Sequence, residues 1–211
     1  MNSKLFIDSF KKIVRDGVPG EKAHTEVMPA NRLFTSQSLK QADKIRQSAV
    51  GVILYPTESS IHSVLIQRPH YDGTHSNQIS FPGGKMDDAD ASLEQTARRE
   101  CYEEVDLPIG TGVRIGELTN VYIPVSNFLV QPYVFFVDEL PRLKPDSREV
   151  KSIISFDVFK LIEEQTLKTT NIRIKQGFIR KNIPYYDING HVVWGATAMM
   201  LSELKAILKQ I

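Results

Sequence analysis

Residues 81–84 read Phe-Pro-Gly-Gly, and residues 99–104 read Arg-Glu-Cys-Tyr-Glu-Glu. The second stretch lies in a run of helix-forming residues from about 91 to 105. At 100° per residue, Glu100, Glu103 and Glu104 fall within about a 100° arc of one helix face. Carboxylates crowded in this way repel one another, and a hard divalent cation, which prefers oxygen ligands, would offset the repulsion. The pattern therefore indicates a metal site that acts on a phosphate ester or anhydride.

An acidic helix face is more often simply solvated, so the neighbouring residues decide between the two interpretations. Gly83 and Gly84 allow a ligand to approach the backbone closely, and Pro82 stiffens the entry to this turn. The acidic loop at 87–90 is rich in aspartate, which favours turns and helix N-caps. A strand, a glycine turn, an acidic loop and an acidic helix in this order favour a site for metal and phosphate.

The segment from Gly84 to Leu107 resembles the Nudix box, written G-x5-E-x7-R-E-U-x-E-E-x-G-U, where U is a bulky aliphatic residue. Residues 99–104 match the R-E-U-x-E-E core, with Cys101 in the aliphatic position. We expect Cys101 to be a small buried apolar residue rather than a nucleophile.

Two positions depart from the general box. Asp90 stands in the place of the first glutamate, and its spacing to Arg99 is one residue longer than usual. Asp106 replaces the second glycine, so we expect the helix exit to differ. The longer spacing is similar to that of the coenzyme A diphosphatase branch, which carries Gly-Gly-x-x-Asp-x-x-Asp before its Arg-Glu.

Further segments also resemble this branch, in the same order along the chain. They are residues 64–68 together with 81–84, the loop and strand at 124–134, and Trp194-Gly195-Ala196-Thr197-Ala198. The arginine and glycine inside the branch signature are Gly73 and Asn77 here, which leaves the substrate open. His70 and His75 lie in the same loop and could offer a donor instead.

The resemblance implies an α/β fold, a Nudix-type α/β/α sandwich with a mixed β-sheet. It implies Mg²⁺- or Mn²⁺-dependent hydrolysis of a diphosphate bond in a nucleoside diphosphate derivative. Coenzyme A, or its acyl or oxidised forms, is the first expectation, with 3′,5′-ADP and 4′-phosphopantetheine as products. The alternatives are a Nudix diphosphatase for ADP-ribose, NADH or another nucleotide, and a nucleotide-binding module without catalysis.

The same resemblance assigns roles to residues. We expect Glu103 and Glu104 to bind the metal, with Glu100 as a further ligand or the general base. Arg99 belongs to the catalytic motif, but we expect it to point away from Glu100 and to pair with Asp90. The full set of candidates is, for catalysis, Glu100, Glu103, Glu104 and Arg99; for the substrate, Arg68, Gly83, Gly84, Ser126 and His75; and for the metal, Gly84, Glu100, Glu103, Glu104 and Glu149, with Glu117 a weaker choice than Glu149.

Composition bounds the remaining possibilities. Of the 211 residues 41% are apolar, which is enough for a core, and the formal net charge is +1. Such a charge gives no bulk attraction to nucleic acid or to a membrane surface. One cysteine excludes an internal disulfide and suits a reducing compartment. We expect a cytoplasmic protein that binds a small nucleotide. The composition does not decide between a monomer and a homodimer.

We expect a single domain over residues 1–211, with an N-terminal helical extension over about 1–48. Periodicity and turn residues predict where the elements lie. The expected helices are 4–15, about 37–45, 91–105, 156–164 and 196–209, and the expected strands are 49–55, 62–68, 78–81, 113–123, 128–137, 149–155, 171–178, 183–188 and 191–194. Polar residues 180–182 are expected to close a hairpin between two of these strands.

Overall fold

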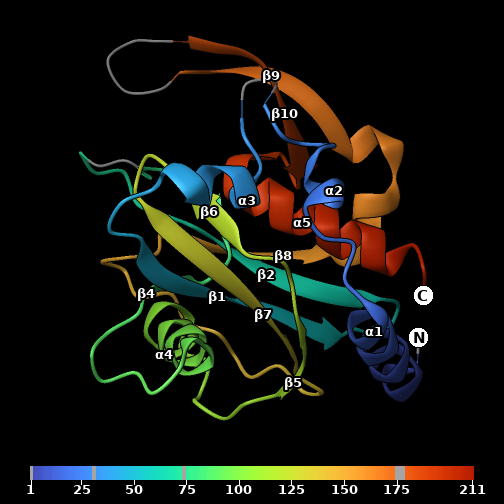
Figure 1. Cartoon of the computed structure of the whole chain (residues 1–211). Helices are drawn as coiled ribbons and strands as arrows, with labels where there is room; N and C mark the ends of the chain where they lie inside the picture. The colour runs from blue at the N-terminus through green and yellow to red at the C-terminus, as the bar shows by residue number, and fades with distance from the viewer. Residues whose placement is uncertain (1, 30–31, 73–74, 174–178) are drawn as a thin grey trace.

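The computed structural model describes residues 2–29, 32–72, 75–173 and 179–211. Within these residues, two sheets and several helices follow one another along the chain (Figure 1). The elements are α1 (Ser3–Asp16), α2 (Glu21–His24), α3 (Thr35–Ser38), the 3₁₀ turn η1 (Leu39–Gln41), β1 (Arg46–Pro56), β2 (Ile61–Gln67), β3 (Ile79–Ser80), β4 (Gly83–Lys85), α4 (Leu93–Val105), β5 (Val113–Glu117), β6 (Val121–Ile123), β7 (Phe128–Phe136), β8 (Ser152–Asp157), η2 (Val158–Ile162), η3 (Glu164–Thr166), β9 (Leu167–Arg173), β10 (Ile179–Ile188), β11 (His191–Val193) and α5 (Gly195–Leu208).

The larger sheet is mixed and has β1 at its centre. In the described part of the chain its strands follow the order β3-β2-β1-β7-β5, with β4 beside β1, β6 beside β7 and β8 beside β2. The β1–β7 pair is parallel, and the other pairs are antiparallel. At one end of the sheet, the strands therefore lie side by side in the order β4, β1, β7 and β6.

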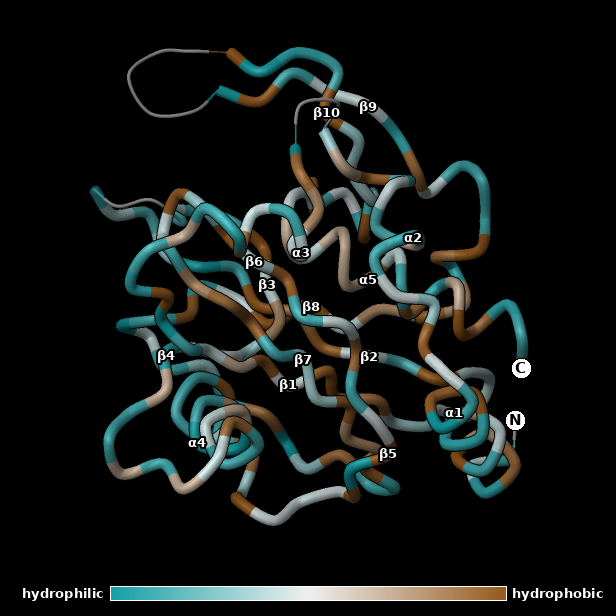
Figure 2. The backbone as a smooth tube through the Cα atoms, viewed as in Figure 1, coloured by the Kyte–Doolittle hydropathy of each residue, from teal (hydrophilic) through white to brown (hydrophobic). Residues whose placement is uncertain are grey.

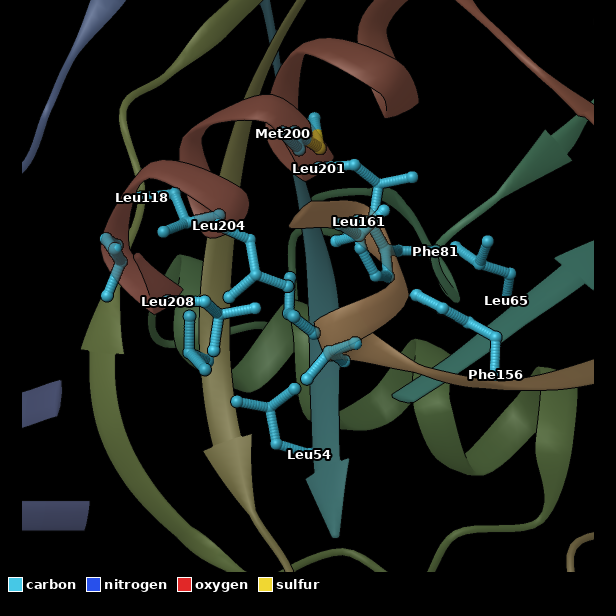
Figure 3. Close-up of a cluster of buried hydrophobic side chains, with 14 of the residues drawn as sticks. Leu54, Leu65, Phe81, Leu118, Phe156, Leu161, Met200, Leu201, Leu204 and Leu208 are labelled. Atoms are coloured by element: carbon cyan, nitrogen blue, oxygen red, sulfur yellow. The ribbon is translucent and has the colours of Figure 1, made fainter. Parts of the chain in front are cut away.

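Helices cover both faces of this sheet, because side chains along β1 point alternately to either side. Val52 and Leu54 belong to the larger core cluster, which α5 and α1 cover. Ile53 packs with Cys101 and Val105 of α4 on the opposite face. Hydrophobic segments run through the central strands (Figure 2), and Figure 3 shows leucines of α5 packed over the sheet. This arrangement confirms the expected mixed sheet between layers of helices.

The N-terminal helix is held in the core. α1 was expected at 4–15 and is found at Ser3–Asp16. Phe6 and Phe10 on this helix are fully buried, and the Phe6 ring lies 5.8 Å from that of Phe136 in β7. The single-domain interpretation of the chain stays a prediction, which this packing supports.

A smaller sheet of the described residues joins β11, β10 and β9. In Figure 1 the β9–β10 hairpin extends above α3 and β6 at the top of the view. The prediction that residues 180–182 close the hairpin is wrong, because they lie inside β10, where the register shifts between Arg180 and Ile183. Residues 174–178, expected to end the first strand, lie outside the described residues.

Other boundaries differ for local reasons. The expected strand at 113–123 is interrupted, because the backbone N–H and the hydroxyl of Thr119 both bond to Glu203 of α5. The helix expected at 156–164 is the end of β8 and then η2, which begins where the Asp157 side chain accepts a hydrogen bond from the Phe159 N–H. The helix expected at about 37–45 is α3 followed by η1 and ends by Gln41.

Candidate active site

The two glycines of the Phe-Pro-Gly-Gly stretch lie in a short strand rather than in a turn. Gly83 pairs with Val50 and Gly84 with Ala49, so the turn prediction for these residues is wrong. A Cβ atom at Gly83 would lie 2.4 Å from the Ala49 carbonyl oxygen, and one at Gly84 would lie 2.4 Å from Oε1 of Glu100. Glycine is therefore required here because the backbone of β1 and a carboxylate of α4 approach β4 so closely.

Helix α4 carries the acidic face, and both of its ends are capped. The Ser92 side chain accepts a hydrogen bond from the Gln95 N–H at the N-terminus. Asp106 follows the last helical residue with φ 59° and ψ 33°, the left-handed conformation that glycine usually supplies there. The expectation that the helix exit differs is therefore wrong, because aspartate tolerates this conformation.

Glu104 is the most enclosed carboxylate of the helix, with 1% of its surface exposed. It accepts a hydrogen bond from the Gly83 N–H at 2.8 Å and another from Arg68 at 3.4 Å. Burial raises the pKa of Glu104 to about 8, against the opposing effects of the Gly83 N–H and the Arg68 charge. The Gly83 N–H and Arg68 together therefore do not offset the cost of burying a negative charge on Glu104.

Arg99 connects the acidic loop to the helix. Its guanidinium donates to both carboxylate oxygens of Asp90, at 3.1 and 2.9 Å, which confirms the predicted pair. Its Nη1 also donates to Glu100 at 2.9 Å and to Glu103 at 2.8 Å. The expectation that Arg99 points away from Glu100 is therefore wrong. The single charge of Arg99 is thus shared among three carboxylates, and Arg99 itself does not line the cavity.

The Asp90–Arg99 pair predicts how stability depends on acidity. The Arg99 hydrogen bonds lower the pKa of Asp90 to about 2, below its ordinary value of 3.8. A carboxyl whose pKa is lowered by folding stabilises the folded state above pH 3.8, and this contribution is lost as the pH falls toward 2. We expect the difference in free energy of unfolding between wild type and Asp90→Asn to shrink by about 2 kcal/mol from pH 5 to pH 2. Urea unfolding at several pH values measures it, and a constant difference would contradict it.

An open cavity of about 1840 Å³ lies beside these groups. Drug-sized ligands need only about 300–1,000 Å³, so an extended ligand fits. Of the candidates from the sequence, the cavity brings together Arg68, His75, Gly83, Gly84, Glu100, Glu104, Ser126 and Glu149. It does not reach Glu103, Arg99 or Glu117, so Glu149 is the better placed of the two candidates for a distal acid.

The carboxylates suit a hard divalent cation by their chemistry. Glu100, Glu104 and Glu149 line the same cavity, and the charge of Glu149 raises the pKa of both other groups, in which burial has the largest effect. In the described ranges, however, no group of three or more His, Cys, Asp or Glu side chains is arranged to hold an ion. Arg99 holds Glu100 and Glu103 instead. The complete ligand set therefore stays a prediction.

Unsatisfied polar atoms mark where a substrate could be held. Within the described residues, the buried Nε of Arg68 and the Oγ of Ser126 have no hydrogen-bond partner. Nδ1 of His75 lies 2.9 Å from Oε1 of Gln78, so one of its nitrogens is already engaged. Asn77 adopts φ 56°, in the left-handed region that favours glycine, whereas Gly73 lies outside the described residues.

Sequence reasoning missed a group of basic residues on the same cavity. They come from the N-terminal extension and from the β9–β10 hairpin, which no motif connects to the acidic helix. They are Arg32, Arg173, Arg180 and Lys181. The only signal was the run of polar residues at 180–182, which was assigned to a hairpin end. Trp194, the N-cap residue of α5, lies in a segment that was expected to begin a helix, and it also lines the cavity.

Comparison with known proteins identifies the family. Residues 45–176 match the NUDIX domain, which is more than half of the chain. The chain belongs to the Nudix family. It is a Nudix hydrolase, a diphosphatase that acts on a nucleoside diphosphate derivative. Nudix hydrolases generally use divalent metals such as Mg²⁺, in agreement with the acidic donors of the cavity.

Some relatives of this Nudix hydrolase have a named activity, and others are uncharacterized. The mitochondrial coenzyme A diphosphatase NUDT8 of Homo sapiens is 34% identical over 130 residues, which are 61% of this chain and 54% of that protein. The chain therefore spans little more than half of that relative. An uncharacterized Nudix hydrolase NudL of Pectobacterium atrosepticum is 31% identical over 170 residues, which are 79% of this chain and 85% of that protein.

Solved structures show the same Nudix fold. An Ap4A hydrolase of C. elegans has a TM-score of 0.54 at 13% identity, covering 79% of this chain and 100% of that chain. A MutT protein of Methanosarcina mazei has a TM-score of 0.51 at 16% identity, covering 79% and 96%. At these identities they confirm the α/β/α sandwich alone.

In the part of the chain that the structure describes, no helix is long and apolar enough to cross a membrane.

Proposed function

We propose that this Nudix hydrolase cleaves the diphosphate bond of coenzyme A, or of its acyl or oxidised forms. The observation that carries the proposal is the spacing of the acidic loop and helix, which resembles the coenzyme A diphosphatase branch. The similarity to NUDT8 supports it, although the chain spans only 54% of that protein. The size of the cavity supports it as well, because coenzyme A is an extended molecule. We also propose a cytoplasmic location, on the single buried cysteine.

The residues of the site divide into groups with separate tasks. Mg²⁺ or Mn²⁺ would be held by carboxylates of Glu100, Glu104 and Glu149 and by the Gly84 carbonyl, with Glu103 as a further ligand. When bound, the cation would supply positive charge that stabilises the negative charge developing on the phosphate oxygens. Every ligand atom in this set is an oxygen, the type that such hard cations prefer.

Protein groups would orient the substrate and move the proton. The unpartnered Nε of Arg68 is suited to bind a phosphate oxygen, since a guanidinium matches phosphate geometry. As the alternative to its role as a ligand, Glu100 would accept a proton from the attacking water, because its partly buried side chain has a raised pKa. Attack at one phosphorus of coenzyme A would release 3′,5′-ADP and 4′-phosphopantetheine.

A substrate panel tests the proposal. Coenzyme A, an acyl-coenzyme A, oxidised coenzyme A, ADP-ribose and NADH would each be incubated with the protein and Mg²⁺, and the products separated by chromatography. We expect kcat/KM to be highest for a coenzyme A form and the products to be 3′,5′-ADP and a 4′-phosphopantetheine derivative. Removal of the metal with EDTA should abolish the reaction, and Mn²⁺ should be compared with Mg²⁺.

Two outcomes would contradict the proposal in different ways. A higher kcat/KM for ADP-ribose or NADH would reject the substrate but keep the Nudix chemistry. Undiminished hydrolysis in EDTA, after dialysis of the protein against the chelator, would reject the metal dependence.

A further inference from the structure

The cavity of the active site has a second end that is basic. Arg32, Arg173, Arg180 and Lys181 line it, and three of these residues come from the β9–β10 hairpin. In the described part of the chain, none of the four pairs with a carboxylate. Arg173, Arg180 and Lys181 are exposed to water, whereas Arg32 is half-buried. Gathered on one cavity, the four cations give this end a positive potential that favours an anionic ligand.

Arg32 is the least solvated of these cations. It is half-buried, and its Nη2 donates to the Tyr122 carbonyl at 2.7 Å, which fixes the guanidinium against β6. Burial lowers the pKa of Arg32, and the nearby charge of Arg180 lowers it further. A partly desolvated guanidinium next to a second cation raises the energy of the empty protein. A bound anion between the two would remove this repulsion.

This basic end lies across the sheet from the carboxylates. Lys85 of β4 pairs with Ser48 of β1, Ser48 with Val130 of β7, and Val130 with Val121 of β6. Three strand spacings of about 4.8 Å separate the two ends by about 14 Å of backbone. In Figure 1 the hairpin lies above β6 and α3, while α4 lies beneath the sheet. The basic residues therefore stand apart from Arg68, which contacts Glu104 of the acidic helix.

We propose that Arg32 and Arg180 form a second phosphate subsite, which binds a phosphate monoester on the nucleoside part of the substrate. This inference rests on the proposed function and deepens it. Coenzyme A carries a 3′-phosphate in addition to its diphosphate, whereas ADP-ribose and NADH do not. With the diphosphate at the acidic end, the 3′-phosphate would lie at the basic end. The subsite would thus select 3′-phosphorylated nucleotides.

Binding of the product nucleotide tests the subsite without relying on turnover. Isothermal titration calorimetry would compare 3′,5′-ADP with 5′-AMP on the full chain in Mg²⁺ buffer. We expect wild type to bind 3′,5′-ADP at least about 10-fold more tightly, since charge-assisted hydrogen bonds are among the stronger ones. The double variant Arg32→Gln/Arg180→Gln should bind the two nucleotides equally. The control Lys11→Gln/Arg15→Gln, which removes two exposed charges from α1, should keep the preference.

Kinetics and a conservative variant add independent readouts. Arg32→Lys keeps the charge and should retain most of the preference. The KM for coenzyme A should rise about 10-fold in the double variant, while the KM for dephospho-coenzyme A stays unchanged. If the double variant fails to fold, the exposed Arg180→Gln alone carries the test and should lose part of the preference.

The outcomes separate this inference from the proposed function. Equal binding of 3′,5′-ADP and 5′-AMP by wild type, or an unchanged preference in a folded double variant, would overturn the subsite. A wild type that prefers 3′,5′-ADP but does not cleave coenzyme A would overturn the proposed function and support the subsite.

Discussion

Replacement of Glu104 by glutamine is expected to lower kcat by about 10³-fold on the best substrate of the panel. Glutamine has nearly the same shape, and its amide oxygen still accepts the hydrogen bond from the Gly83 N–H. It lacks the negative charge with which Glu104 would hold the cation, and it keeps the contact with Arg68 at most as a neutral hydrogen bond. The side chain is 1% exposed, so water supplies no substitute. Steady-state kinetics with Mg²⁺ measures the effect, and circular dichroism verifies the fold.

The matched control for this experiment lies on the same helix. Glu94 pairs with Arg98 and Arg114 and does not line the cavity, so Glu94→Gln should keep kcat within about 2-fold of wild type. Glu103→Gln is the informative intermediate case, because Glu103 is half-exposed and bound to Arg99. We expect it to slow hydrolysis, and rates equal to wild type would remove Glu103 from the ligand set. A Glu104→Gln variant within 10-fold of wild type would reject the central role of Glu104.

Arg99→Gln is expected to reduce the free energy of unfolding by about 3 kcal/mol. The substitution leaves the Asp90 carboxylate, with 2% of its side chain exposed, without its charged partner. It also removes the cation between Glu100 and Glu103 and the hydrogen bond to the Lys85 carbonyl, so the acidic groups repel one another. Urea unfolding in EDTA measures the loss, since a divalent cation would mask part of it.

A double-mutant cycle measures the interaction energy between Asp90 and Arg99. Because Asp90→Asn removes the uncompensated charge, Arg99→Gln should be less damaging in that background than in wild type. Arg15→Gln, on an exposed arginine, should change stability by less than about 0.5 kcal/mol. A loss below about 1 kcal/mol for Arg99→Gln would show that this network contributes little.

The acidic helix could be predicted because its signals are local. Helix formers and the spacing of Glu100, Glu103 and Glu104 all lie within about four turns, whereas the cap at Ser92 was not predicted, since the aspartates of 87–90 were favoured. The Asp90–Arg99 pair was also accessible, because the two residues flank the same helix entry. In α4 and at its entry, helix propensity and charge pattern favour the same conformation, and the structure adopts it.

Long-range contacts could not be predicted in the same way. The Gly83–Gly84 segment resembles a turn in isolation, and only its pairing with β1 makes it a strand. The guanidinium of Arg99 is long enough to reach acidic groups on both sides, which a helical wheel does not show. Arg32 and Arg180 are about 150 residues apart in the chain, so only the folded sheet and hairpin place them on one cavity. Tertiary packing, rather than local preference, decides each of these cases.

The contacts of Arg99 also bear on the order of assembly in the cell. Proteins built around a metal often remain unstructured until the ion arrives, because their negatively charged ligands have no other counter-charge. Here a side chain of the chain itself fills that role for Glu100 and Glu103. We therefore expect the chain to fold before a divalent cation binds, so that metal loading follows folding.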